Sequence, residues 1–422
     1  MGLPSVALAH MFESITFKNA VGPGPLLDIG AIAEALLFYG RVSIVGNSAT
    51  LKAMLSGIPP FVALGLLRDK RLEFHYLADQ VAISSKPTTT GRNLHDLMRF
   101  SSPQHTIEKV GPEVFRAAAG NTGQARIASS QFTRLLHSLS HEGFDQKAVL
   151  ASLIDHSATE RSVSALLSLA APGYTTGEPL RFRIEQQSQG FFVDTNLDFD
   201  EVNAIYRRTV PPEYSSLSEA YVLALMQGAY EATYYAATLG SEVAVAPIER
   251  VVQAAAVEAV AQRRAKSEVE IGRFVDLTMN DARTIREAVN SGRVSFAQVV
   301  RLLDSADKFR HWLQQQPVDA ELVGTYYQAI VKDSWADKLP GKSARWAVFT
   351  GLGLAADAFG TAPWGTLGGV AISAVDSFLC EKLISGWKPH QFVEGELKAL
   401  FATDQSSAEA KNGEASQETP RK

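Results

Sequence analysis

The fold is decided by residues 26–83, which read LLDIGAIAEALLFYGRVSIVGNSATLKAMLSGIPPFVALGLLRDKRLEFHYLADQVAI. Apolar residues recur at helical spacing in some parts of this stretch and alternate in others, which predicts helices and strands respectively. The predicted elements are a helix over 26–40, a strand over 41–46, helices over 49–55 and 61–67, and two strands within 72–83. Helix, strand, helices and strand in this order indicate an α/β arrangement with a parallel crossover.

Downstream of this stretch the patterns are mainly helical. Residues 94–169 predict helices, and residues 180–184 and 190–193 alternate like a β-hairpin. Further helices are predicted over 199–208, 216–239, 247–266, 282–290, 296–314 and 320–332. The predicted fold class is therefore an α-rich α/β (α+β) chain, with an N-terminal α/β module and a mainly helical C-terminal half.

Composition shifts predict the domain boundaries. Pro172 lies in an Ala-Pro-Gly stretch that marks a boundary, which divides the chain into a module over 1–172 and a mainly helical domain over 173–402. The last residues, 403–422, are polar and charged without large apolar side chains, so a disordered tail is expected there.

A Gly- and Ala-rich segment within the second domain predicts a helical hairpin over 343–385. Its centre reads WAVFTGLGLAADAFGTAPWGTLGGVAISAVDSFLCEKLISGW over residues 346–387. Pro363 breaks a continuous helix, since proline lacks an amide hydrogen and clashes with the preceding turn. Each arm is shorter than the 20 or so apolar residues that span a bilayer, so a buried core is favoured over insertion in a membrane.

Two sets of residues in this hairpin are candidate contact sites. Trp346, Trp364 and Trp387 flank its arms and its tip, a placement that suits a membrane interface or a partner surface as well as a helical core. Asp357 and Asp376 lie on the two facing arms as a candidate buried acid pair. A buried carboxylate needs a partner, so an internal ion pair is the favoured interpretation and a pH-sensitive latch the alternative.

Composition bounds the functional classes. The 422 residues are 46% hydrophobic and 20% charged, with a net charge of −5, which is ordinary for a globular protein and argues against a nucleic-acid interface. Cys380 is the sole cysteine, so an intramolecular disulfide and a cysteine-based zinc cluster are excluded. Residues 1–17 lack the pattern of a secretory signal, so a cytoplasmic protein, peripheral to the membrane at most, is expected.

Motifs that carry chemistry are weak throughout the sequence. The turn at residues 46–50, GNSAT, follows a predicted strand but lacks the lysine of a phosphate-binding loop, so it is interpreted as a capped turn. His137 and His141 have the spacing of one helical face, yet the wider zinc motif is missing. No metal site and no cofactor is predicted, and the catalytic residues stay unknown.

Three hypotheses about function follow. The leading one is a cytosolic, non-enzymatic binding or scaffold protein that contacts an unknown protein partner or associates with itself. The second is a conditional membrane-associated effector that uses the 346–387 hairpin. The third is a hydrolase in the N-terminal module, where His75, His95 or His156 would meet a nearby Asp or Ser, because such groups are recognised by geometry and not by spacing.

Overall fold

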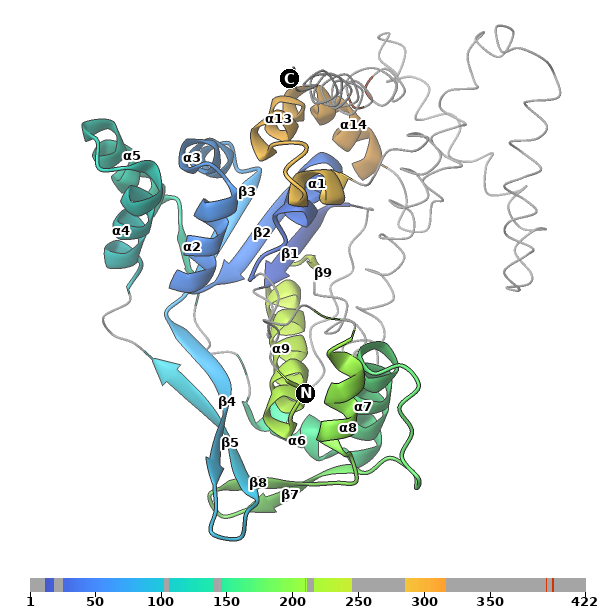
Figure 1. Ribbon diagram of the computed structural model, residues 1–422. Coiled ribbons are helices and arrows are strands. Elements are labelled where there is room, and N and C mark those ends of the chain that lie inside the picture. The colour runs from blue at the N-terminus through green and yellow to red at the C-terminus, as the bar shows by residue number, and fades with distance from the viewer. Residues whose placement is uncertain are drawn as a thin grey trace, which may run out of the picture.

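The computed structural model describes residues 12–18, 26–101, 106–139, 144, 146–208, 210, 216–244, 285–315, 392 and 397. Both helices and strands are present along these residues (Figure 1). The predicted mixture of helices and strands is therefore confirmed. The strands form two sheets, one of five strands and one of four.

The five-stranded sheet is parallel in every pairing. Its strands are β1 (Ser14–Lys18), β2 (Arg41–Gly46), β3 (Leu72–Leu77), β6 (His137–Leu139) and β9 (Glu242–Ala244). Their spatial order is β6-β3-β2-β1-β9, so the chain moves outward from β1 to β6 and later returns to the other side of β1. The direction of winding reverses between β1 and β9, which makes this place a topological switch point.

One face of this sheet is apolar and covered by helices. The crossovers that lead outward contain α1 (Ile29–Phe38), α2 (Ser48–Gly57), α3 (Pro60–Arg68), α4 (Ile107–Ala119) and α5 (Gly123–Arg134). Right-handed crossovers place such helices on the same face. α12 (Ile285–Asn290), α13 (Phe296–Arg301) and α14 (Leu303–Gln314) join the same core. The strand residues that face these helices include Ile15, Val42, Ile44, Leu72 and Phe74, each at most 1% exposed.

The opposite face carries mainly polar side chains. α9 (Glu219–Thr238) precedes β9 and packs on this face, as the reversed crossover requires. Its Tyr235 forms a small apolar cluster with Val45 and Leu77. The described polar residues of this face are Ser14, Thr16, Lys18, Arg41, Ser43, Glu73, His75 and His137.

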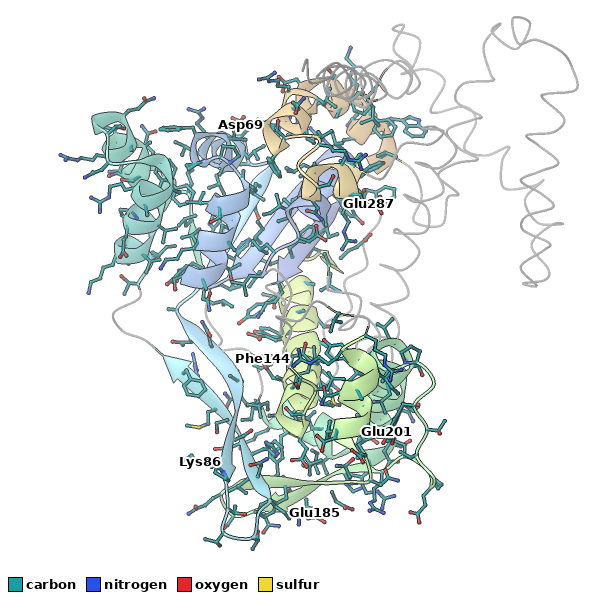
Figure 2. All side chains as sticks on the ribbon, viewed as in Figure 1. Asp69, Lys86, Phe144, Glu185, Glu201 and Glu287 are labelled. Carbon is teal, nitrogen blue, oxygen red and sulfur yellow. The ribbon has the colours of Figure 1, made fainter. Side chains whose placement is uncertain are left out.

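The four-stranded sheet is antiparallel and has the order β4-β5-β8-β7. Its strands are β4 (Asp79–Pro87), β5 (Asn93–Ser101), β7 (Phe182–Gln187) and β8 (Gly190–Thr195). A second core joins this sheet to α6 (Gln146–Ile154), α7 (His156–Ala170), α8 (Phe199–Tyr206) and the first half of α9. Figure 2 labels Lys86 on β4 and Glu185 on β7, at the end of this sheet far from the parallel one.

Local signals explain where several helices begin. Asp28 accepts a hydrogen bond from the Ala31 amide at the start of α1, and Asp198 accepts two from the first turn of α8. Ser295 forms a capping box with Gln298 at the start of α13. Each cap satisfies amide groups that lack a partner within the helix.

The prediction that residues 94–169 are mainly helical was wrong in two places. Residues 93–101 form β5, which pairs with β4 over its whole length, and residues 137–139 form β6 beside β3. Pairing with a neighbouring strand overrode the local helical pattern: β5 pairs with the strand just before it in the chain, and β6 pairs with β3, about 60 residues earlier. The sequence also did not predict β1 or β9, which are five and three residues long. The hairpin expected over 180–193 forms as β7 and β8.

The predicted hairpin over 343–385 lies outside the described residues, as do Trp346, Trp364, Trp387, Asp357 and Asp376. The boundary at residue 172 and the tail over 403–422 stay predictions. Within the part of the chain that the structure describes, no single helix is long and apolar enough to cross a membrane, while α2 and α3, bent by 108° at their junction, pass that test together by length and composition.

Candidate functional site

A row of side chains crosses the polar face of the five-stranded sheet toward the carboxyl ends of its strands. Lys18, Val45, His75 and His137 are register partners on β1, β2, β3 and β6. Lys18 is the last residue of β1 and therefore borders the switch point between β1 and β9. Ligands of open parallel sheets bind in the crevice outside the carboxyl ends of the strands at such a point.

Lys18 forms a buried ion pair with α9. Its Nζ lies 3.2 Å from Oε2 of Glu231, and the two side chains are only 7% and 5% exposed. Gln227, one turn earlier in α9, donates a hydrogen bond of 3.0 Å to the same carboxylate oxygen. Because removing charges from water is costly, a pair at this depth needs close geometry to be tolerated. The result is a line of polar groups from the end of β1 along α9.

Glu73 and His75 form a second polar group on the same face. Nε2 of His75 and Oγ of Ser43 each lie 3.3 Å from Oε2 of Glu73 and donate to it. The hydrogen bond from His75 lowers the pKa of Glu73 below its ordinary value of 4.5, burial opposes this shift, and the charge of Arg41 adds to it. The His75 ring stacks on His137, with ring centres 5.2 Å apart.

The turn after β2 supplies its own cap. Oδ1 of Asn47 accepts hydrogen bonds from the amides of Ala49 and Thr50, at 2.9 and 3.1 Å. These are the groups that would otherwise bind an anion at the start of α2. The interpretation of residues 46–50 as a capped turn is confirmed.

A different set of side chains meets in the four-stranded sheet. Ser85 on β4 and His95 on β5 are direct register partners, and Oγ of Ser85 lies 2.8 Å from Nδ1 of His95. Nε2 of His95 lies 3.1 Å from Oε2 of Glu219, the first residue of α9. A hydroxyl, an imidazole and a carboxylate thus form one continuous chain of hydrogen bonds.

The surroundings of His95 fix its position. His95 is fully buried, whereas Ser85 is exposed and the Glu219 side chain is 26% exposed. β8 approaches so closely that a Cβ on Gly190 would lie 2.2 Å from the His95 carbonyl oxygen. The ring centre of Phe191 lies 5.9 Å from the centre of the His95 imidazole. A side chain other than hydrogen at position 190 would push β8 away from β5.

A cavity of about 650 Å³ lies between α1, the end of α2 and the connection from α12 to α13. Its wall is mostly apolar, and Asp28 and Asn290 are its main polar groups. The Asp28 carboxylate pairs with Arg286 at 2.6 Å and accepts from Asn290 at 2.8 Å. These polar groups therefore hold α12 against α1.

The structure assigns different places to the histidines that the sequence singled out. His137 belongs to strand β6, so its predicted sharing of a helical face with His141 is wrong, and His141 is outside the described residues. His156 is an exposed residue in the first turn of α7. Among the residues that the structure describes, no group of three or more metal-ligating side chains converges.

The sequence did not point to Lys18, Glu231, Ser85 or Glu219. Lys18 could have been noticed as the polar end of the alternating segment SITFK, which is β1. The other three gain their partners only through the fold, because Glu219 is 124 residues from His95 and Glu231 lies on the same distant helix.

No family model, no curated protein and no solved structure matches this chain. A fold alone hosts many unrelated functions, so the function has to be argued from these sites.

Proposed function

We propose that the protein is a binding protein that takes a small anionic metabolite, of the nucleotide class, at the carboxyl edge of its five-stranded sheet. The observation that carries this proposal is the buried Lys18–Glu231 pair at the end of β1, beside the switch point. The sheet winds in opposite directions on the two sides of β1, which is the arrangement that opens a crevice for a ligand.

The chemistry of the pair supports an anionic ligand. A lysine ammonium is a cation with three hydrogen-bond donors, so the ligand group that it attracts is an anionic one such as a phosphate or a carboxylate. Glu231 and Gln227 can in turn accept from and donate to hydroxyl or amino groups. A ligand with an anionic group for Lys18 and a sugar or base for Glu231 and Gln227 would bind to both.

The energetic cost of the pair also supports a role in binding. Replacing a buried ion pair with apolar side chains is often neutral or stabilising by about 1–4 kcal/mol. A buried pair of this kind is therefore weak evidence of a stabilising role, and contact with a ligand is the explanation that we propose for it.

Other parts of the proposal rest on the sequence. We also propose that the C-terminal half is mainly helical and contains a Gly/Ala-rich hairpin over 343–385. This hairpin would be a surface for a protein partner or for self-association. Conditional membrane association through Trp346, Trp364 and Trp387 is the alternative use of that hairpin. A cytoplasmic location, at most peripheral to the membrane, accompanies this proposal. Liposome co-sedimentation of the full chain beside a variant lacking 346–387 separates these two uses.

Thermal unfolding in the presence of nucleotides tests the binding site. The ligands are ATP, GTP, NAD and FAD, with adenosine and inorganic phosphate as controls for the two halves of a nucleotide. The matched variant is Lys18→Met/Glu231→Gln, which removes both charges and keeps an acceptor for Gln227. We expect at least one nucleotide to raise the melting temperature of the wild type and to leave the variant unchanged, since a ligand stabilises only the state that binds it. Equal shifts in both proteins, or none in either, would refute the site.

A further inference from the structure

The chain Ser85–His95–Glu219 has the connectivity of an activated nucleophile. A carboxylate only accepts hydrogen bonds, so Nε2 of His95 carries the hydrogen that is donated to Glu219. In the neutral imidazole the other nitrogen, Nδ1, then has a free lone pair. That lone pair faces Oγ of Ser85 at 2.8 Å and accepts the hydroxyl hydrogen. Glu219 thereby selects the one tautomer in which His95 can act as a base toward Ser85.

The exposure of Ser85 and the burial of His95 suit a nucleophile and its base. Ser85 is exposed and can meet a reagent from solution, while His95 is fully buried and shielded from water. Other exposed serines of this protein have a different partner: Ser56 and Ser168 donate to backbone carbonyls four residues earlier in their helices, at 2.9 Å in each case. A carbonyl oxygen cannot take up a proton at neutral pH, so these hydroxyls are not activated.

The base is held by four elements. β4 supplies Ser85, β5 supplies His95 and α9 supplies Glu219. The backbone of β8 packs at Gly190 against the His95 carbonyl oxygen. A group that is already fixed in its reactive geometry needs little reorganisation during reaction. If His95 only linked the β4–β5 hairpin to α9, its bond to Glu219 would be enough. That structural role does not require an exposed hydroxyl, Ser85, facing Nδ1 of His95.

We propose that Ser85 is a nucleophile that takes the acyl group of a carboxylic ester, with His95 as its general base and Glu219 as the residue that positions His95. Oγ forms a bond to the acyl carbon while its proton passes to Nδ1. The bond to the leaving alcohol breaks, and His95 returns the proton to that oxygen. A water then gives a proton to Nδ1 of His95 and attacks the acyl carbon. The bond between that carbon and Oγ breaks, His95 returns the proton to Oγ, and the carboxylic acid leaves.

This activity goes beyond the proposed nucleotide site and is separate from it. Glu219 and Glu231 both lie on α9 but are 12 residues apart, which is about 18 Å along a helix. The Lys18→Met/Glu231→Gln variant should therefore keep the reactivity of Ser85. Loss of one property with retention of the other shows which proposal has failed.

Covalent labelling of the full-length protein tests the nucleophile. The protein is incubated with a fluorophosphonate, which bonds its phosphorus to an activated serine oxygen with loss of fluoride, and the modified peptide is identified by mass spectrometry. Hydrolysis of p-nitrophenyl acetate is followed in parallel. We expect Ser85 to be labelled at least about 100-fold faster than Ser56, as general-base assistance provides about 10²–10⁴-fold.

Variants separate reactivity from structure. Ser85→Ala should abolish the label and the hydrolysis while the protein remains folded. Glu219→Gln alters a partly exposed side chain that keeps an acceptor, and we expect it to fold and to lose at least about 10-fold in labelling rate. His95→Asn should lose about 100-fold or more if it folds. The proposal is overturned if Ser85 reacts no faster than Ser56, or if folded Glu219→Gln reacts like the wild type.

Discussion

On one face of the five-stranded sheet, Ile15, Ile44 and Phe74 pack against helices in one large apolar core; on the other, Lys18, Glu73 and His75 stand among buried hydroxyl groups. The same strands supply both faces, because successive side chains of a strand point in opposite directions. An apolar face stabilises the fold through the area that it buries. A face with paired charges costs desolvation energy, so its composition is better explained by what it binds.

The largest expected effect is on the apolar face. Phe74→Ala should lower the free energy of unfolding by about 4 kcal/mol, because a fully buried ring is replaced by a cavity. Phe61→Ala is the matched control, since Phe61 is 44% exposed and loses far less buried area. Urea unfolding measures both. If the two variants are equally destabilised, the apolar face is not the main source of stability.

The next effect is on the polar face. Lys18→Met alone should lower the free energy of unfolding by about 3 kcal/mol, because Glu231 is left as a buried charge without its lysine. Lys18→Met/Glu231→Gln should recover most of that loss, since no unpaired charge remains. A second substitution thus restores stability on the polar face, which distinguishes Lys18→Met from the cavity left by Phe74→Ala. A double variant that is less stable than the single one would show that the pair is mainly structural.

The sequence predicted the parts of this comparison that depend on local pattern. β2 and β3 were predicted from their alternating, strand-like patterns, and α1 to α3 from helical spacing and turn residues. β5 was missed because LHDLMRF resembles a helix until it is paired with β4. His95 was named among the candidate histidines, but Ser85 and Glu219 were not, because strand register and a distant helix bring them to it. Burial of Lys18 likewise follows from the return of α9 to β1.

A smaller effect is expected at the edge between β1 and β9. Oγ1 of Thr16 and Oγ of Ser241 are hydrogen-bonded at 2.5 Å, and both residues are buried. Thr16→Val keeps the shape and removes the hydroxyl, so we expect a loss of about 1 kcal/mol. Ser241 retains its hydrogen bond to the Ala236 carbonyl, which limits the cost. A change near 3 kcal/mol in urea unfolding would show that the polar face contributes more to stability than this account allows.

The smallest effect depends on pH. The hydrogen bond from His75 lowers the pKa of Glu73 in the folded state below its ordinary value of 4.5. A group with a lowered folded pKa contributes stability above its unfolded value and loses it as the pH falls through the folded value. The difference in unfolding free energy between the wild type and Glu73→Gln should therefore be constant near neutral pH and shrink below about 4.5. Urea unfolding at a series of pH values measures it, and a difference that is the same at every pH contradicts the assignment.

The most direct measurement is mass spectrometry of the intact protein under non-denaturing conditions, after incubation with an equimolar mixture of ATP, GTP, NAD and FAD. The account predicts that the wild type carries one nucleotide per chain and that Lys18→Met/Glu231→Gln, folded by its urea unfolding curve, carries none. A wild type without any nucleotide, or a variant that retains it, would contradict the claim that the polar edge of the five-stranded sheet is the binding site.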